Sequence, residues 1–130
     1  MPAVPPDAEE EPRVFRDGGV SYLRIPAANP RETAAFYEAV FGWQVDSNRD
    51  DPSFEDSTGH VIGHFVTELP VAGAAGIRPY VYVAEVDATL EDAVARGAEI
   101  VDAPYPEGDL RVATFRDPAG NVVGVWERVG

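Results

Sequence analysis

Aromatic and basic side chains recur at alternate positions of two short apolar runs, a pattern typical of strands with one functional face. In residues 20–25, Tyr22 and Arg24 fall on one face, with aliphatic residues on the other. In the second run, Tyr80 and Tyr82 alternate with valines. Ring faces hold flat molecules and organic cations, and a guanidinium adds a polar anchor. These residues predict a small-molecule pocket with aromatic walls, unless the rings simply fill the interior as core.

An internal repeat places the other candidates. Residues 57–65 align with residues 118–126 at an offset of 61, so that Gly59 falls on Gly120. A repeat of this length indicates two similar units. The alignment matches Phe65 with Trp126 on the inward face of the last strand of each unit. It also pairs His64 with Val125, which places His64 on the face that packs against a helix, or at a dimer seam, and not in the cavity.

The pocket prediction therefore rests on a small set of side chains. The predicted ligand-binding residues are Tyr22, Arg24, Phe65, Tyr80, Tyr82, Thr114 and Trp126. Thr114, together with Arg116, supplies polar points on the strand before the last. The chain has no phosphate-binding glycine loop and no nucleophile motif. Glu85 and Glu127 alternate onto packing faces, which makes both weak candidates for a general base.

These positions require each unit to run strand, helix and then three strands. Asn29 and Pro30 open the first helix, and Gly42 ends it. Asp87 is predicted to cap the second helix, which Gly97 ends. The strands are predicted at residues 20–25, at 43–45, around 54, at 61–69, 79–86 and 98–101, at 110–115 and after the turn at 117–121. Two such units, residues 18–72 and 73–130, should pack under a pseudo-twofold as an α+β fold, preceded by a mobile tail over residues 1–17.

Composition narrows the function classes. The chain has 130 residues, a formal net charge of −13 and no cysteine. The charge argues against a nucleic-acid partner, and the lack of cysteine excludes disulfide and thiolate chemistry. No apolar run could span a membrane, and no signal peptide opens the chain, so a cytoplasmic protein without a membrane partner is expected. The excess of acid favours a cationic ligand, or only keeps the protein soluble.

The motifs resemble those of a known group. The order of elements, with FYEAVFGW at residues 36–43 and DPAGN at residues 117–121, resembles the vicinal oxygen chelate superfamily. This superfamily includes glyoxalase, the bleomycin-resistance proteins and the extradiol dioxygenases, and the resemblance covers residues 18–128. It implies two βαβββ modules whose mixed, curved sheets form a cup-shaped cavity. It also implies a homodimer.

The resemblance raises the question of a metal. Enzymes of the superfamily hold Mn, Fe, Ni or Zn with side chains from the first and last strands of each module. Carrying these positions over gives Tyr22, Gly63, Tyr80 and Gly124. Glycine has no side-chain ligand and a neutral phenol is a poor one, so the usual metal is expected to be absent. His64 stays a minor candidate ligand, because a register slip of one residue would turn it inward.

Three functions follow as alternatives. The first is a metal-free protein that binds a small cationic or aromatic molecule in the cup. The second is a lyase, isomerase or dioxygenase that uses an unusual metal site, or that acts without metal through Tyr22, Arg24 and Tyr80. The third is a protein without a ligand that serves through protein contacts alone. The aromatic strands and the missing metal ligands favour the first.

Overall fold

The computed structural model of the chain describes residues 13–130. The predicted tail therefore lies mostly outside the described residues. Of the part that is described, Arg13 donates from Nη1 to the carbonyl oxygen of Thr58 at 3.2 Å. This contact places the start of the described chain against the turn before β4.

The described residues form two modules with the same order of elements, which confirms the predicted α+β fold of two βαβββ units. Module 1 comprises β1 (Tyr22–Pro26), α2 (Pro30–Phe41), β2 (Gln44–Asp46), β3 (Ser53–Glu55) and β4 (Ile62–Val66). Module 2 comprises β5 (Tyr80–Tyr82), α3 (Val86–Ala95), β6 (Glu99–Glu107), β7 (Leu110–Arg116) and β8 (Val122–Arg128). Sheet A has the strand order β1-β4-β3-β2 and sheet B the order β5-β8-β7-β6. In each sheet the first and last strands of the module pair in parallel.

Helix α2 begins and ends as its sequence predicts. The side chain of Asn29 accepts a hydrogen bond from the backbone N–H of Glu32 at 3.3 Å, and Pro30 occupies the first turn. Gly42 ends the helix with a φ of 73°, a conformation that costs glycine little because it lacks a Cβ. Alanine and aromatic residues bury one side of the helix against sheet A.

Helix α3 begins differently, and the predicted cap at Asp87 is wrong. The N-cap residue is Glu85, whose side chain makes no capping hydrogen bond. The carboxylate of Glu127, on the neighbouring strand β8, accepts from the backbone N–H of Val86 at 2.9 Å instead. Asp87 lies in the first turn and pairs with Arg111 at 2.9 Å. A cap supplied from another element leaves no local signal in the sequence of the helix.

Strand β6 is longer than predicted. It continues to Glu107, through residues that the sequence assigned to a loop from Tyr105 onward. The reason is a tight hairpin: Glu107 pairs with Leu110, and Gly108 supplies the positive φ that the turn needs.

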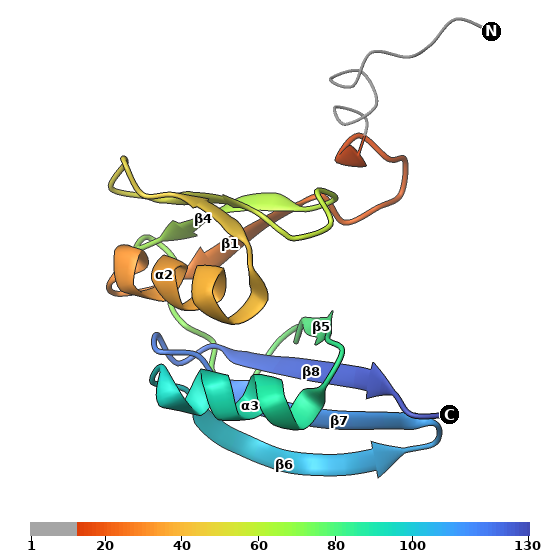
Figure 1. The fold of residues 1–130 in the computed structure, drawn as a ribbon. Helices are drawn as coiled ribbons and strands as arrows, with labels where there is room; N and C mark the ends of the chain where they lie inside the picture. Colours follow the sequence, from red (N-terminus) through yellow and green to blue (C-terminus); the bar gives the residue numbers. More distant parts are fainter. Residues whose placement is uncertain (1–12) are drawn as a thin grey trace, which may run out of the picture.

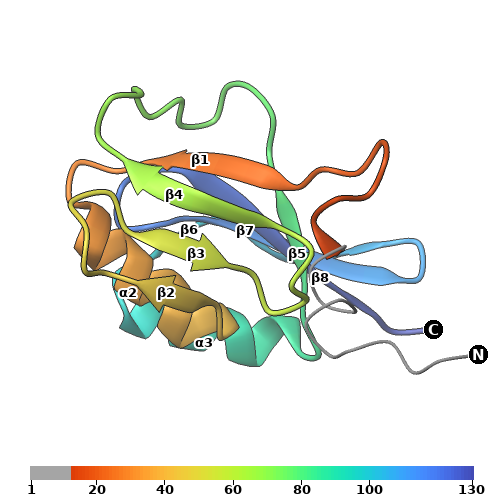
Figure 2. The ribbon, with the colours of Figure 1, turned by 90° about the horizontal axis from the view of Figure 1, so that it is seen from above.

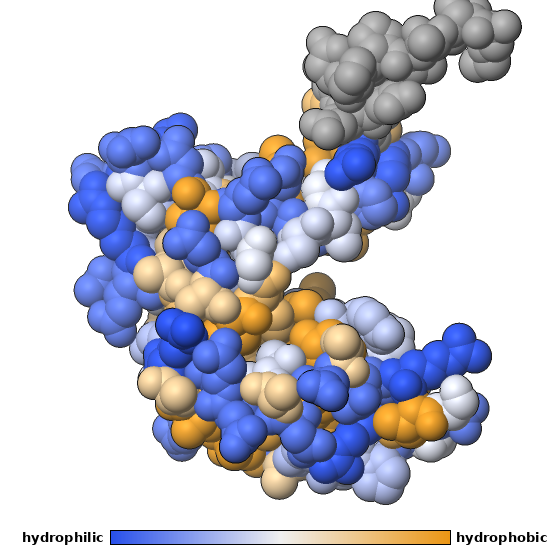
Figure 3. Space-filling view, in the orientation of Figure 1, coloured by the Kyte–Doolittle hydropathy of each residue, from blue (hydrophilic) through white to orange (hydrophobic). Residues whose placement is uncertain are grey.

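The two modules share one core. Each helix covers the inner face of its own sheet, and Figure 1 shows α2 directly above α3. Phe36 of α2 meets Phe115 of β7 edge to face, with ring centroids 5.9 Å apart. Figure 2 looks onto sheet A from the side opposite α2, where neither helix of the described part of the chain covers it. Figure 3 shows apolar residues gathered where the modules meet, beside an open notch between them.

The DPAGN turn joins the modules as well as reversing the chain. Asp117 is buried, and its carboxylate accepts hydrogen bonds from the Tyr37 hydroxyl of module 1 at 2.9 Å and from the backbone N–H groups of Ala119 and Asn121. The side-chain amide of Asn121 donates to Asp117 and to the carbonyl oxygen of Pro26. The motif is therefore a structural link between the two halves of the chain.

Neither helix of the described residues has the length and apolar character needed to cross a membrane.

Candidate functional site

The turns before β4 and β8 look alike in sequence but differ by one residue. In module 2 the N–H of Asp117 bonds to the carbonyl of Asn121, whereas in module 1 the N–H of Asp56 bonds to the carbonyl of Val61. The first turn is therefore one residue longer, which shifts every later position of β4 against β8. Hydrogen bonds just after β1 and β5 agree with this shift. The N–H of Ala27 bonds to the carbonyl oxygen of Val66, and the N–H of Val83 bonds to that of Trp126, so Val66 and Trp126 occupy equivalent positions.

This shift corrects three predicted placements. His64, not Gly63, is the counterpart of Gly124, and Val66, not Phe65, is the counterpart of Trp126. Phe65 is fully buried in the core beside Phe54, so the prediction that it faces a ligand is wrong. His64 lies beside Tyr22 on the outer face of sheet A, the face away from the helix, so of its two predicted places the helix-packing one is wrong. Side chains alternate along a strand, so one extra turn residue exchanges the two faces.

The outer face of sheet B carries most of the predicted ligand-binding residues. Tyr80 pairs with Gly124, and its ring lies over the space that a side chain at Gly124 would fill. Tyr82 and Trp126 meet edge to face with ring centroids 4.9 Å apart. Tyr80 is 45% exposed and Tyr82 is 58% exposed. Large rings held apart from the core in this way are available to a ligand or a partner.

The floor beneath these rings is buried although no helix of residues 13–130 covers it. Thr114 is 0% exposed, and the neighbouring Val112 and Val122 are also buried. The hydroxyl of Thr114 donates to the carboxylate of Asp102 at 2.7 Å and accepts from its backbone N–H at 3.1 Å. Thr114 therefore holds the Asp102 carboxylate in place and is itself out of reach of a ligand.

Two residues of β6 belong to this face and were not predicted. Tyr105 pairs with Val112 across the sheet, and Asp102 pairs with Thr114. The pKa of Tyr105 is raised, first by desolvation and then by the nearby Tyr80, Glu107 and Asp102. No alternation of apolar and polar residues marks this segment, because two register shifts interrupt the pairing of β6 with β7. Such irregularities are visible only once the strands are paired.

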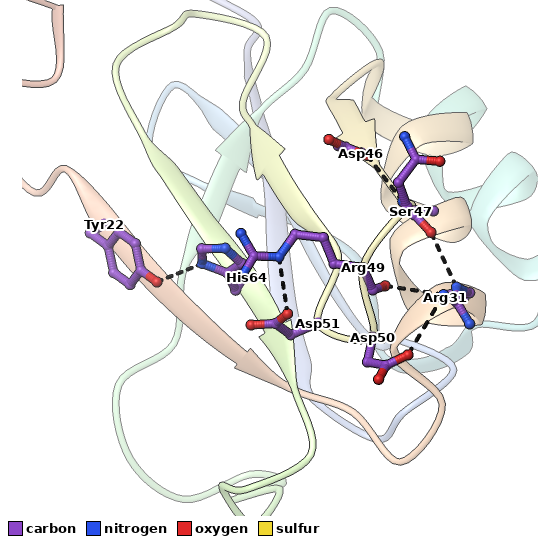
Figure 4. A network of polar contacts seen from close by, with 9 residues as sticks. Tyr22, Arg31, Asp46, Ser47, Arg49, Asp50, Asp51 and His64 are labelled. Carbon is purple, nitrogen blue, oxygen red and sulfur yellow. Dashed lines mark hydrogen bonds and ion pairs between the residues drawn. The ribbon is translucent and has the colours of Figure 1, made fainter.

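The outer face of sheet A is polar. Tyr22, which is 48% exposed, forms a hydrogen bond between its hydroxyl and Nδ1 of His64 at 2.6 Å (Figure 4). Arg24, predicted to be a ligand contact, lies on the same face and pairs with Glu68 at 3.2 Å. The remaining predicted residues are thus divided between two sheets: Tyr22 and Arg24 on sheet A, and the others on sheet B.

Two surface hollows of the described residues lie elsewhere. One, of about 280 Å³, is lined by Arg13, Gly42, Gln44, Glu55, Asp56, Ser57 and Gly59. The other is a shallow depression over β2 and β3. None of the predicted ligand-binding residues lines either hollow.

The residues at the implied metal positions do not suit a divalent ion. The resemblance placed these positions at Tyr22, Gly63, Tyr80 and Gly124. In the corrected register, the pair Arg24 and His64 of module 1 matches the pair Tyr80 and Gly124 of module 2, so Arg24 and His64 replace Tyr22 and Gly63. Of the corrected set, only His64 offers a good ligand atom, because arginine and glycine offer none and a neutral phenol is poor. Within residues 13–130, no three side chains of histidine, cysteine, aspartate or glutamate are grouped to hold a metal.

The paired βαβββ modules, with parallel first and last strands, define the class of fold seen in glyoxalase-like proteins. Residues 22–126 match the sequence model of the Glyoxalase-like domain, and the chain belongs to that family. A search of curated protein sequences finds no match.

Solved structures of the same group resemble the chain in fold. A glyoxalase/bleomycin resistance protein/dioxygenase family enzyme from Burkholderia phytofirmans PsJN has a TM-score of 0.69 at 24% identity, covering 83% of this chain and 97% of that one. A glyoxalase family protein from Bacillus anthracis has a TM-score of 0.65 at 20% identity, covering 87% and 97%. TnmS3, an antibiotic binding protein from Streptomyces sp. CB03234, has a TM-score of 0.68 at 20% identity, covering 85% and 96%.

Proposed function

We propose that the chain is a binding protein for a small aromatic or cationic molecule, and that the outer face of sheet B is its binding surface. The observation that carries the proposal is a group of three rings on this face: the exposed Tyr80, which lies over Gly124, and the exposed Tyr82, which packs against the half-buried Trp126. A glycine beneath a ring leaves space that a side chain would occupy. Aromatic rings of this size supply much of the contact area in small-molecule sites.

The surroundings of the rings favour a positive charge on the ligand. The Asp102 carboxylate is fixed by Thr114 at the edge of this face, and Tyr105 lies near both Asp102 and Tyr80. A cation over a ring face gains about 0.5–2 kcal/mol, and an adjacent carboxylate adds to this. The net charge of −13 attracts cations to the protein from a distance.

The comparisons supply two kinds of support. Family membership makes a ligand-binding role plausible, and TnmS3, of similar fold, is described as antibiotic binding. The poor donor set at the implied metal positions supports binding without the usual metal. Metal-dependent lyase, isomerase or dioxygenase chemistry of the superfamily would need ligands that these positions do not offer in residues 13–130.

We also propose that the protein acts as a homodimer. On the outer face of sheet B, Tyr80 and Tyr82 stand close together in β5 and are 45% and 58% exposed. Exposed apolar groups of this kind are typical of surfaces that another chain covers. A second copy laid over the outer face of sheet B would turn an open aromatic surface into an enclosed site.

A thermal-shift screen of aromatic and cationic compounds tests the binding proposal. At least one compound should raise the melting temperature in a concentration-dependent way. Trp126→Leu should abolish the shift, whereas Phe15→Leu, which changes an exposed ring outside both sheets, should keep it. The proposal fails if no compound stabilises the protein, or if the shift survives in Trp126→Leu. Stoichiometric Mn, Fe, Ni or Zn in the purified protein would favour the enzymatic alternative.

A further inference from the structure

Three side chains that can donate hydrogen bonds stand in one row across sheet A. Arg24 of β1 pairs with His64 of β4, and His64 pairs on its other side with Ser53 of β3. Residues that are paired in this way point to the same face of the sheet, with their Cβ atoms about 5 Å apart. We infer that this row is a subsite for a small oxyanion, the carboxylate or phosphate group of a ligand.

The Tyr22 hydroxyl lies where it can select the tautomer of the His64 imidazole. A neutral imidazole has one nitrogen that donates and one that accepts. When the Tyr22 hydroxyl donates to Nδ1 across the observed 2.6 Å, the proton of His64 resides on Nε2. Nε2–H then donates to a bound oxyanion, next to the guanidinium of Arg24. Tyr22 is thus a positioning residue in this subsite.

The ion pair of Arg24 leaves its guanidinium available. Its partner Glu68 is at 3.2 Å, but the side chains are 53% and 59% exposed, so the pair contributes little stability. A guanidinium has five N–H groups, and one carboxylate engages at most two of them. An incoming oxyanion can use the remaining N–H groups, and it competes with Glu68 for the positive charge of the guanidinium.

A purely structural role does not explain the imidazole. The fold requires no side chain at this position, because the counterpart of His64 in module 2 is Gly124 and the strands pair in the same way. Beyond Ser53, the next paired residue is Asp46 of β2, whose negative charge repels anions. The next pair on the same face of β3 and β4 is Glu55 with Ile62, which adds a second carboxylate away from Arg24. The oxyanion therefore binds at the Arg24 end of the row.

The NMR signals of the imidazole groups test this inference directly. The chain has two histidines, so the signal of His64 reports on the proposed subsite and that of His60 serves as an internal control. Sodium acetate or inorganic phosphate is added at constant ionic strength. Saturable shifts are expected at His64, with those at His60 much smaller. Comparing the dissociation constants from the acetate and phosphate titrations shows which oxyanion is preferred. The nitrogen shifts of the free protein should show the proton on Nε2 of His64, and Tyr22→Phe should allow both tautomers.

Four variants separate the subsite from general charge effects. Arg24→Gln should weaken oxyanion binding about tenfold, the loss of one charge-assisted contact. Glu68→Gln should strengthen binding, because it removes the competitor. Arg96→Gln is the control, because it removes an arginine of similar exposure that pairs with Asp92 of α3. Its affinity for the oxyanion should equal that of wild type after correction for the change in net charge. Ser53→Ala should weaken binding by a smaller factor than Arg24→Gln.

The inference is overturned if neither anion shifts His64 more than His60, or if Arg24→Gln and Arg96→Gln have equal effects. It does not depend on the aromatic face of sheet B. Loss of oxyanion binding would leave the compound screen above unchanged, and failure of that screen would leave the His64 titration unchanged.

Discussion

At the scale of single residues, Asp117 and Tyr37 form a buried polar link between the two modules. The carboxylate of Asp117 is buried and receives hydrogen bonds from both modules. Its place in a tight turn could be predicted from the DPAGN sequence, because proline, glycine and asparagine favour such turns. Its bond to Tyr37, 80 positions away, could not, because only the docking of the two modules brings them together.

Removing the acceptor should therefore destabilise the protein strongly. Asp117→Ala leaves the buried Tyr37 hydroxyl and two backbone N–H groups without their partner, and should lower the free energy of unfolding by about 3 kcal/mol. Tyr37→Phe removes one donor only and should cost about 1–2 kcal/mol. Chemical denaturation measures both. Equal, small losses in the two variants would contradict the role of Asp117 as a link.

The same pair predicts a loss of stability in alkali. Burial, together with the nearby Asp117 carboxylate, raises the pKa of Tyr37 well above the ordinary 10.0. Above about pH 10 the unfolded chain releases this proton while the folded chain keeps it, so the free energy of unfolding falls as pH rises. Tyr37→Phe should flatten this fall. Identical slopes for wild type and variant between about pH 9 and 11 would contradict it.

At the scale of elements, the order of strands and helices follows from local signals. Caps such as Asn29 and Gly42, and the alternation around Leu23, are local, and the structure confirms them. The register of β4 was not predictable, because the turns at Gly59 and Gly120 share the same key residues and differ by one. This single difference reversed the predicted faces of Phe65 and His64.

Two glycine substitutions test the corrected register. A Cβ at Gly63 would overlap the backbone oxygen of Leu23 and the buried ring of Phe54, so Gly63→Ala should cost about 3 kcal/mol. A Cβ at Gly124 would overlap the half-exposed ring of Tyr80, which can swing aside. Gly124→Ala should therefore cost about 1 kcal/mol while impairing ligand binding. Equal stability losses in denaturation experiments would contradict these assignments.

At the scale of the whole molecule, two similar modules present different outer faces. Sheet A carries the polar row of Arg24 and His64, and sheet B carries the rings of Tyr82 and Trp126. The family and the pseudo-twofold were predictable from the repeat and the motifs, and both are confirmed. The division of the predicted site between two faces was not, because it depends on how the modules dock through their helices.

The central claim is that the outer face of sheet B binds a small molecule. The most direct test is NMR of the two indole N–H groups during titration with a compound from the screen, because Trp126 lies on that face and Trp43 lies in the core. The account predicts a saturable shift of the Trp126 signal while the Trp43 signal stays in place. A compound that binds and leaves Trp126 unmoved would contradict it.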